Sequence, residues 1–280
     1  MNHAAFDQSP NQYLYHRPMT RNIQGRAAGC SFRNAASFRN APQVAVVMLA
    51  LLCMPVLADP TVEDAERQLA DSHAKIQSGT AKTKTIQDFI LQSGQRIQSE
   101  SLAEVAWMRK GSTILYRSDV TATQTQAGGG EIEMKSTGRW RSVHDGEFFY
   151  TVTEQHGKTS AAKYKPDPAQ FGEPSAVFAN LRKHFKLERM PDAKLDGFDC
   201  IVIELTPLIP ETSPTTHTTA YFRKDTGLNI QNVSHDKDGR QAFISTTYDI
   251  EINVPVPVER FKFEPPPGVE VEDKTLNQSD

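Results

Sequence analysis

The sequence predicts an α+β protein built on a curved antiparallel sheet, with helices covering its concave face. Three observations predict this fold class. Short alternating runs rich in β-branched residues fill most of residues 80–252, turn signals separate these runs, and only two amphipathic helical stripes occur. Many consecutive hairpins with few helices are typical of an antiparallel sheet that has its helices on one side.

The first 58 residues have the order of a signal peptide. Residues 1–43 contain five arginines, no lysine and a single acid, Asp7, and they lead into an apolar run at residues 44–57. That run is shorter than the ~20 residues that a permanent membrane helix needs. Because it ends in Val56-Leu57-Ala58, we expect cleavage after Ala58 and export to the periplasm.

Several alternatives for this leader stay open. Translation could start at Met1 or at Met19, and the apolar run could remain as an uncleaved anchor. Cys53 could be lipidated, although Leu52 stands where a lipobox has a small residue. We expect residues 59–280 to form a single domain.

The charge and the cysteines of this expected domain exclude some functions. Without the five arginines and the one acid of the leader, the 31 basic and 34 acidic side chains of the whole chain leave residues 59–280 with a net charge of −7. A nucleic-acid partner is therefore not expected. Cys200 is the only thiol in this range, so it cannot form an internal disulfide, and we expect it to be buried in a strand.

Two helices are expected. Thr61 followed by Asp64 is a helix start, and apolar residues recur at helical spacing as far as Ile76, before Gly79 ends the helix. A second helix is expected over residues 174–187. Its apolar stripe consists of Val177, Phe178, Leu181 and Phe185.

The strands are expected on both sides of the second helix, with a long polar loop at 207–214. Alternation along residues 198–205 predicts a strand that is buried on both faces. Phe261 and Phe263 are expected on one face of a closing strand, which the three prolines at 265–267 would end. The other expected strands are residues 83–91, 99–108, 113–120, 139–143, 148–153, 160–164, 218–223, 228–233 and 242–252.

The end of the chain resembles the LolA-like family. Residues 258–273 match its C-terminal motif F-x-F-x-P-P-x-G-V-x-V-x-D without a gap. Residues 106–110 resemble the family's L-W-V-K-R strand end, residues 143–150 resemble its V-S-D-G-K-x-L-W-x-Y hairpin, and residues 225–228 fit the hairpin before the last long strand. The resemblance covers residues 62–273, and the tail motif is its specific part.

The resemblance implies an unclosed β-barrel with a helical lid. It also implies a role like that of the namesake, which takes triacylated lipoproteins from an inner-membrane ABC exporter to an outer-membrane acceptor. The family's lid-contacting arginine falls on Lys110, with Arg109 one residue earlier, and arginine and lysine are not equivalent as a latch. The chain also has longer inserts at residues 121–138 and 207–217.

We therefore expect a monomeric, non-enzymatic periplasmic protein that binds the acyl chains of lipids or lipoproteins. An RseB-type sensory or interaction module on the same scaffold is the alternative. Arg109 and Lys110 are the candidates for the residue that contacts the lid. The apolar residues named below are expected to line a cavity, and the alternative is that they form a packed core. The expected cavity lining consists of Trp107, Leu115, Phe148, Tyr150, Phe178, Leu181, Phe185, Phe261 and Phe263.

The sequence predicts no catalytic residue, metal or cofactor. It contains no G-x-S-x-G, no H-E-x-x-H and no glycine-rich phosphate loop between a strand and a helix. The histidines of residues 59–280 are far apart, and none forms a sequence pair at metal-ligand spacing. They are His73, His144, His156, His184, His217 and His235.

Overall fold

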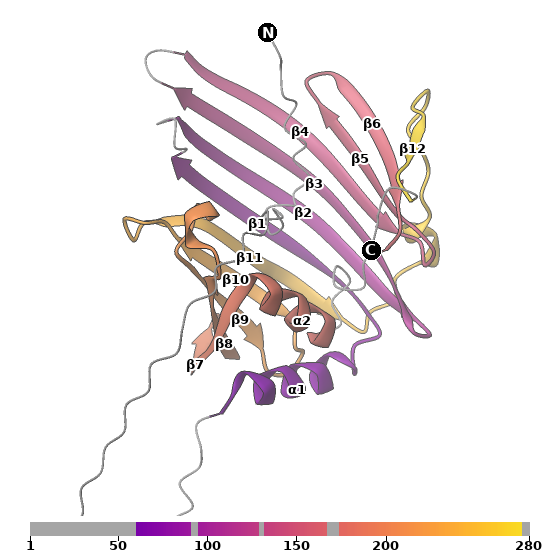
Figure 1. The fold of residues 1–280 in the computed structure, drawn as a ribbon. Helices are drawn as coiled ribbons and strands as arrows, with labels where there is room; N and C mark the ends of the chain where they lie inside the picture. Colours follow the sequence, from indigo (N-terminus) through magenta and orange to yellow (C-terminus); the bar gives the residue numbers. More distant parts are fainter. Residues whose placement is uncertain (1–59, 91–94, 129–131, 167–173, 276–280) are drawn as a thin grey trace, which may run out of the picture. The chain divides into compact units, whose positions relative to one another are not determined.

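The computed structural model describes residues 60–90, 95–128, 132–166 and 174–275 (Figure 1). Pro60–Asp280 forms one compact unit. The expected signal peptide and its cleavage after Ala58 lie outside the described residues. None of the helices in the described ranges is both long and apolar enough to cross a membrane.

Twelve strands form one sheet in the order β12-β6-β5-β4-β3-β2-β1-β11-β10-β9-β8-β7. The described pairings are antiparallel, apart from the parallel pairing of β12 with β6. The end strands β7 and β12 are not neighbours, so the sheet is open, and the predicted fold class is confirmed. The strands are β1 (Ser78–Ile90), β2 (Arg96–Lys110), β3 (Thr113–Gly128), β4 (Ile132–His144), β5 (Phe149–Gln155), β6 (Lys158–Tyr164), β7 (Phe185–Leu195), β8 (Phe198–Pro207), β9 (His217–Arg223), β10 (Asn229–His235), β11 (Gln241–Ile252) and β12 (Val271–Asp273).

Two helices pack against the β7–β9 end of the sheet (Figure 1). Helix α1 (Val62–His73) starts with a capping box, in which the Thr61 hydroxyl accepts from the Asp64 N–H and the Asp64 carboxylate accepts from the Thr61 N–H, each at 3.2 Å. Helix α2 (Pro174–His184) follows β6. Short 3₁₀ turns lie at η3 (Pro210–Thr212), within the expected polar loop, and at η4 (Val258–Phe261).

The register defines two faces of the sheet. On one face, Ile201 and Ile203 of β8 and Ala220 of β9 pack against the two helices, and we call it the helix-side face. On the other, Leu115 of β3 packs against Phe261 in the segment that follows β11, and we call it the tail-side face. Since successive residues of a strand point to opposite faces, the strand pairs extend this division across the sheet.

Strand β8 has both of its faces covered, as its sequence predicts. Cys200, Ile201 and Ile203 are fully buried, and Val202 is 5% exposed. The expected burial of Cys200 is therefore confirmed, and this burial raises the pKa of its thiol.

Both helices end earlier than predicted. Helix α1 stops at His73, and β1 begins at Ser78, so Gly79 lies in a strand instead of ending a helix. Helix α2 stops at His184, and Phe185 begins β7, a strand that the sequence did not predict. The side chain of Phe185 still packs against the core beneath the helices. Its apolar character alone therefore could not tell a helical position from a strand position.

The predicted closing strand is also wrong. Phe261 ends the 3₁₀ turn η4, and Phe263 lies in irregular chain. The strand of this region is β12, which pairs with β6 ten residues after Phe261. Prolines at 255 and 257 remove backbone donors just before this segment, so it lies on the sheet through side-chain contacts and not through a strand ladder.

Candidate functional site

The predicted lining residues of the second helix form a packed core. Phe178 is 1% exposed and its ring centroid lies 5.9 Å from that of Phe222 in β9. Leu181 and Phe185 pack against the same cluster, which also contains Leu69 of α1. These side chains fill the space between the helices and β7–β9.

Five of the predicted lining residues lie on the opposite side of the sheet. Leu115 and Phe261 share a buried tail-side cluster. The ring of Phe263 stacks on Tyr150 at 4.1 Å between centroids, with 6° between the ring planes. Phe148 meets Tyr150 edge to face at 6.3 Å. The structure therefore does not bring the predicted set together, because the sheet separates these five from the residues beneath the helices.

Trp107 and Arg109 lie on the helix-side face. Their strand positions pair with Tyr116 and with the buried Ile114 of β3. The indole ring of Trp107 covers Gly79, where an added Cβ would come within 2.3 Å of the ring. Lys110 is exposed and belongs to the other face of β2. Of the two latch candidates, only Arg109 is on the face that carries the helices.

From β11 to β5, the helix-side face is almost free of charge. In the described side chains of these strands, Arg109 is its only charged member. The other members are small, hydroxyl-bearing, amide, apolar or aromatic. They include Ser245, Thr247, Thr83, Thr85, Ala81, Ser101, Ala103, Val105, Trp107, Tyr116, Ser118, Val120, Trp140, Ser142, His144, Phe149 and Thr151.

Several hydroxyl groups of this face form hydrogen bonds with side chains of the neighbouring strand. Thr83 and Thr247 join their hydroxyls at 3.2 Å, and the Thr85 hydroxyl donates to Ser245 at 3.1 Å. The Ser99 hydroxyl donates to the side-chain oxygen of Gln87 at 3.0 Å. Because these polar groups already have partners, an apolar molecule laid against them would leave few unpaired donors or acceptors.

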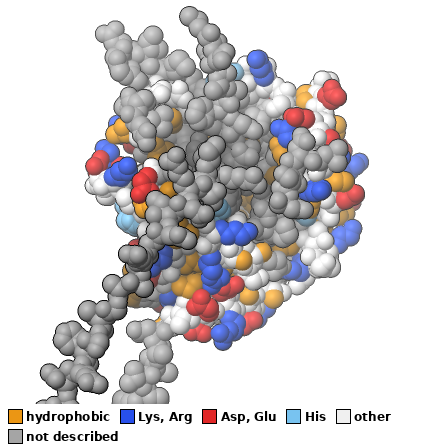
Figure 2. Space-filling view, viewed as in Figure 1, with side chains coloured by type: hydrophobic (Ala, Val, Ile, Leu, Met, Phe, Trp, Pro, Cys, Tyr) orange, Lys and Arg blue, Asp and Glu red, His pale blue; other side chains and the backbone are white. Residues whose placement is uncertain are grey.

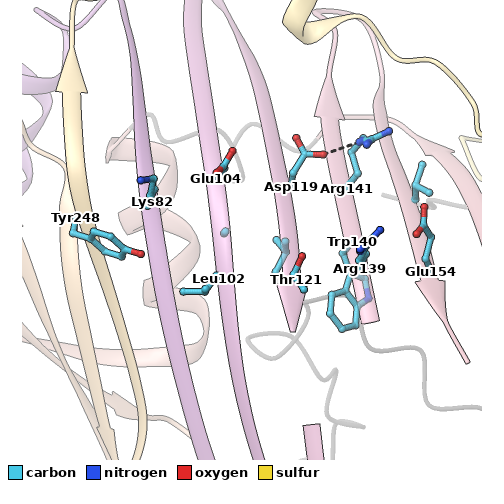
Figure 3. Close-up of a pocket in the computed structure, with 13 residues that line it drawn as sticks. Lys82, Leu102, Glu104, Asp119, Thr121, Arg139, Trp140, Arg141, Glu154 and Tyr248 are labelled. Carbon is cyan, nitrogen blue, oxygen red and sulfur yellow. Dashed lines mark hydrogen bonds and ion pairs between the residues drawn. The ribbon is translucent and has the colours of Figure 1, made fainter. Parts of the chain in front are cut away.

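The tail-side face of the same strands is charged. Lys82 pairs with Asp249 at 3.0 Å, Lys84 pairs with Glu100 at 2.9 Å, and Arg141 pairs with Asp119 at 2.7 Å. An open hollow of about 440 Å³ lies over these strands, and Figure 3 shows the charged side chains that line it from β1 to β5. In Figure 2, basic and acidic side chains are interspersed on the visible described surface.

Asp119 is the centre of the tail-side charge network. Its carboxylate accepts hydrogen bonds from Arg117 at 2.6 Å and from Arg141 at 2.7 Å. Partial burial acts to raise the pKa of Asp119, but the two guanidinium groups outweigh it and leave this pKa below its ordinary value. The charges on this face are thus arranged as mutually compensating pairs.

One pair of histidines was not apparent from their spacing in the sequence. The strand register places His217 of β9 opposite His235 of β10, and their rings stack. The signal that could have found them is two strands joined by a hairpin, with a histidine at equal distance from the turn. Within the described ranges, no group of three or more potential ligands is placed to hold a metal ion.

The neutral helix-side face could in principle have been found from the sequence. Alternate positions of β1 and β2 are uncharged in one register, apart from Arg109, whereas the other register contains all their other charged residues. The expected cavity lining instead included Phe148, Tyr150 and Phe263 because they are aromatic, and these residues belong to the tail-side face.

No protein-family model matches the sequence, and no curated protein matches it. Solved structures do match. A LolA superfamily protein from Nitrosomonas europaea is 11% identical, with a TM-score of 0.27, and the match covers 72% of this chain and 98% of that one. An uncharacterized conserved protein from Thermus thermophilus is 9% identical, with a TM-score of 0.44, and the match covers 76% and 98%.

MucB is a third similar structure. In the Pseudomonas aeruginosa MucA/MucB complex, the match is 13% identical with a TM-score of 0.36, and it covers 72% of this chain. The chain spans about three fifths of the length of the MucB chains that it matches, between 59% and 62%. The matched structures thus include a member of the LolA superfamily, the family that the sequence resembles.

Proposed function

We propose that this protein is a periplasmic carrier that holds acyl chains against the helix-side face of β11 to β5. The observation that supports this most is the near absence of charge from that face in the described residues, where Arg109 is the exception. The opposite face of the same strands is lined with ion pairs. Charged side chains are common on sheet faces exposed to solvent, so their near absence from this face supports contact with an apolar molecule.

Burial of the hydrocarbon alone would supply enough binding energy. Each methylene transferred from water contributes ~0.8 kcal/mol, so a dozen methylenes contribute on the order of 10 kcal/mol before the costs of ordering are subtracted. The paired hydroxyls of Thr83, Thr85 and Ser99 require no partner in the cargo. Selection would therefore act on the length and volume of the chain more than on its polar group.

Helix α2 lies beside this face, against β8 and β9, and would border the bound cargo. Arg182 of α2 ties the helix to α1 through Glu66 at 2.7 Å and Glu63 at 3.4 Å. Ion pairs with such exposure are worth about 0–1 kcal/mol each. The buried Phe178 side chain holds α2 more firmly to the core over β8 and β9, so the cargo would enter and leave over β11 to β5 with this packing in place.

The finer parts of the proposal concern the biological setting. Residues 59–280 would act as one monomeric, non-enzymatic domain after cleavage behind Ala58. Its cargo would be the acyl chains of lipids or lipoproteins, delivered by an inner-membrane ABC exporter and passed to an outer-membrane acceptor.

A sensory or interaction module of the RseB type is the second candidate. The exposed Lys110 in the family's latch position favours it, because a lysine on the tail-side face cannot hold a lid on the helix-side face. Capture of a transmembrane anti-sigma protein by the purified domain, without any exporter component, would favour this second function.

Native mass spectrometry of the protein purified from the periplasm tests the first proposal. The wild type should release acyl-bearing species on activation. Val105→Glu places a charge on the helix-side face and should lower the bound fraction by roughly tenfold or more, because an unpaired charge against hydrocarbon is strongly unfavourable.

Leu102→Glu is the matched control. Leu102 lies three residues away on the tail-side face of the same strand and is 49% exposed, so this variant should bind as the wild type does. Recovery of an empty wild-type protein, or equal losses in the two variants, would count against acyl binding on the helix-side face.

A further inference from the structure

His217 and His235 form a cross-strand pair at the end of β9 and β10. The two residues stand directly opposite each other in the register. Their ring centroids are 4.7 Å apart, with 20° between the ring planes. Both side chains are half-buried. The pair belongs to the tail-side face, so it is independent of the proposed acyl-binding surface.

The Thr216 hydroxyl contacts the ring of His217 and two backbone carbonyls. The Thr216 hydroxyl donates to the backbone carbonyls of His235 at 3.2 Å and Asp236 at 3.3 Å. It also lies 3.1 Å from Nδ1 of His217. In the tautomer that has its proton on Nδ1, the Thr216 oxygen accepts from Nδ1–H of His217 while the hydroxyl donates to a carbonyl. In that tautomer Nε2 of His217 has the free lone pair, and the Nδ1 contact is the support that metal-binding histidines commonly have.

His235 also has a ring nitrogen that is not engaged. Its Nδ1 is buried and has no hydrogen-bond partner within the described part of the chain. A buried nitrogen without a partner carries an energetic cost. A ligand that accepts the lone pair of the ring would remove this cost, or a rotation of the ring would bring the other nitrogen to the same ligand.

We propose that His217 and His235 form a two-histidine binding site for a divalent late transition-metal ion, with Cu²⁺ bound most tightly. Opposed residues of an antiparallel pair have Cβ atoms about 4.5–5.5 Å apart, which lets two imidazoles reach one ion at roughly 2.0–2.1 Å after a rotation about their Cβ–Cγ bonds. Water fills the remaining coordination positions.

The identity of the ligands decides the class of metal. Neutral imidazoles favour copper, nickel and zinc, and copper is the most tightly bound of the divalent first-row ions. The carboxylate of Asp236, the residue after His235, already accepts from the backbone N–H of Asp238 and from the backbone and side chain of Arg240. Two imidazoles without an oxygen ligand do not suit hard cations such as Mg²⁺.

Titration of the untagged protein with CuSO₄ in a non-coordinating buffer at neutral pH tests the proposal. The wild type should bind Cu²⁺ at this site, and its electron paramagnetic resonance spectrum should show coupling to two imidazole nitrogens. His217→Ala and His235→Ala should each lower the affinity at least about tenfold, which is the loss that an outer-shell partner alone can cause.

Two further variants sharpen the test. Thr216→Val should lower the affinity by roughly tenfold, because it removes the support of Nδ1 of His217. His156→Asn alters an exposed histidine in the β5–β6 turn and should leave the affinity unchanged.

Equal Cu²⁺ affinity in the wild type and in the double variant His217→Ala/His235→Ala would overturn the proposal. A wild-type spectrum with coupling to fewer than two nitrogens would do the same, and this measurement does not depend on any variant folding. Neither result bears on acyl binding by the helix-side face.

Discussion

On the helix-side face of β1 to β5, the described side chains are neutral apart from Arg109, whereas on the tail-side face of the same strands lysines, arginines and carboxylates alternate. The backbone is common to both faces, so the difference comes from the side chains alone. One surface of this sheet is therefore nearly without charge in the described residues, and the other is covered with ion pairs. A shift of one residue in register would exchange the two.

The two buried clusters at these faces also differ. The helix-side cluster joins the helices to β7, β8 and β9 through many large side chains. The tail-side cluster consists of Ala106, Leu115 and Phe261, with Met108 and Val256 packed against it. The larger cluster fixes the end of the sheet where α1 and α2 lie, and the smaller one fastens the segment that follows β11.

The largest expected effect comes from Phe178→Ala in the helix-side cluster. Phe178 is 1% exposed, and its loss should lower the free energy of unfolding by about 3–5 kcal/mol, as measured by urea denaturation. Phe261→Ala, in the equally buried tail-side cluster, should cost about 3 kcal/mol. A loss below about 1 kcal/mol for Phe178→Ala would mean that the helices do not stabilise the sheet.

The next largest effect is expected from Gly79→Ala. An added Cβ would meet the Trp107 ring at 2.3 Å and the backbone oxygen of Glu251 at 2.6 Å, so the strand itself must shift. Such overpacking should cost about 1–3 kcal/mol, measured as the shift in the urea midpoint.

Gly138→Ala is the comparison for this variant. There the three atoms nearest to the added Cβ all belong to the Trp140 ring, the first at 2.6 Å, and a ring can move more easily than a backbone. If Gly138→Ala proved the more damaging of the two, the backbone contact at Gly79 would not be the cause.

Gly79 also shows which parts of the fold could be predicted from the sequence. Most strands, the start of α1 and the open antiparallel sheet could be predicted, because alternation and capping are local signals, whereas β7 and β12 were missed. The role of Gly79 could not, since it depends on Trp107, which the β1–β2 register places above it. In isolation, a glycine after an amphipathic run looks like a helix end.

The candidate site was predictable only in part for a similar reason. Phe178 and Leu181 could be assigned to the helix core from their spacing alone. Tyr150 and Phe263 could not be assigned to a face, because Phe263 lies in irregular chain that has no alternation to follow. The pairing of His217 with His235 depends on the centre of the β9–β10 turn, which the predicted strand ends did not define closely enough.

A smaller effect is expected from Arg182→Ala, which removes the ion pairs between α2 and α1. Unfolding should be easier by about 1 kcal/mol or less, because these pairs are partly exposed. Hydrogen exchange of the α2 amides should be faster, while β8 remains unchanged. Faster exchange in β8 as well would show that the helix and the sheet open together.

The smallest effect is expected from Asp119→Asn on the tail-side face. The pKa of Asp119 is lowered in the folded protein, so its contribution to stability is present above the unfolded value of about 3.9 and is lost as the pH falls through the folded pKa. At pH 7 the variant should be less stable by about 1 kcal/mol or less, since the carboxylate is partly exposed.

The difference between the wild type and this variant should vanish in strongly acidic solution, as followed by thermal unfolding from pH 7 to pH 2. Asp238→Asn, at a highly exposed carboxylate of the β10–β11 turn, serves as the control and should show little change. A gap for Asp119→Asn that grew towards acid pH would contradict the sign of this pKa shift.

Quenching of tryptophan fluorescence by a brominated fatty acid tests acyl binding by the helix-side face most directly. Both tryptophans of the sequence, Trp107 and Trp140, occupy helix-side positions, so bound bromine atoms should quench the wild type in a saturable manner. A tail-side reporter, Tyr248→Trp in a Trp107→Phe/Trp140→Phe background, should not be quenched. Quenching of the tail-side reporter, with none in the wild type, would contradict the proposed site.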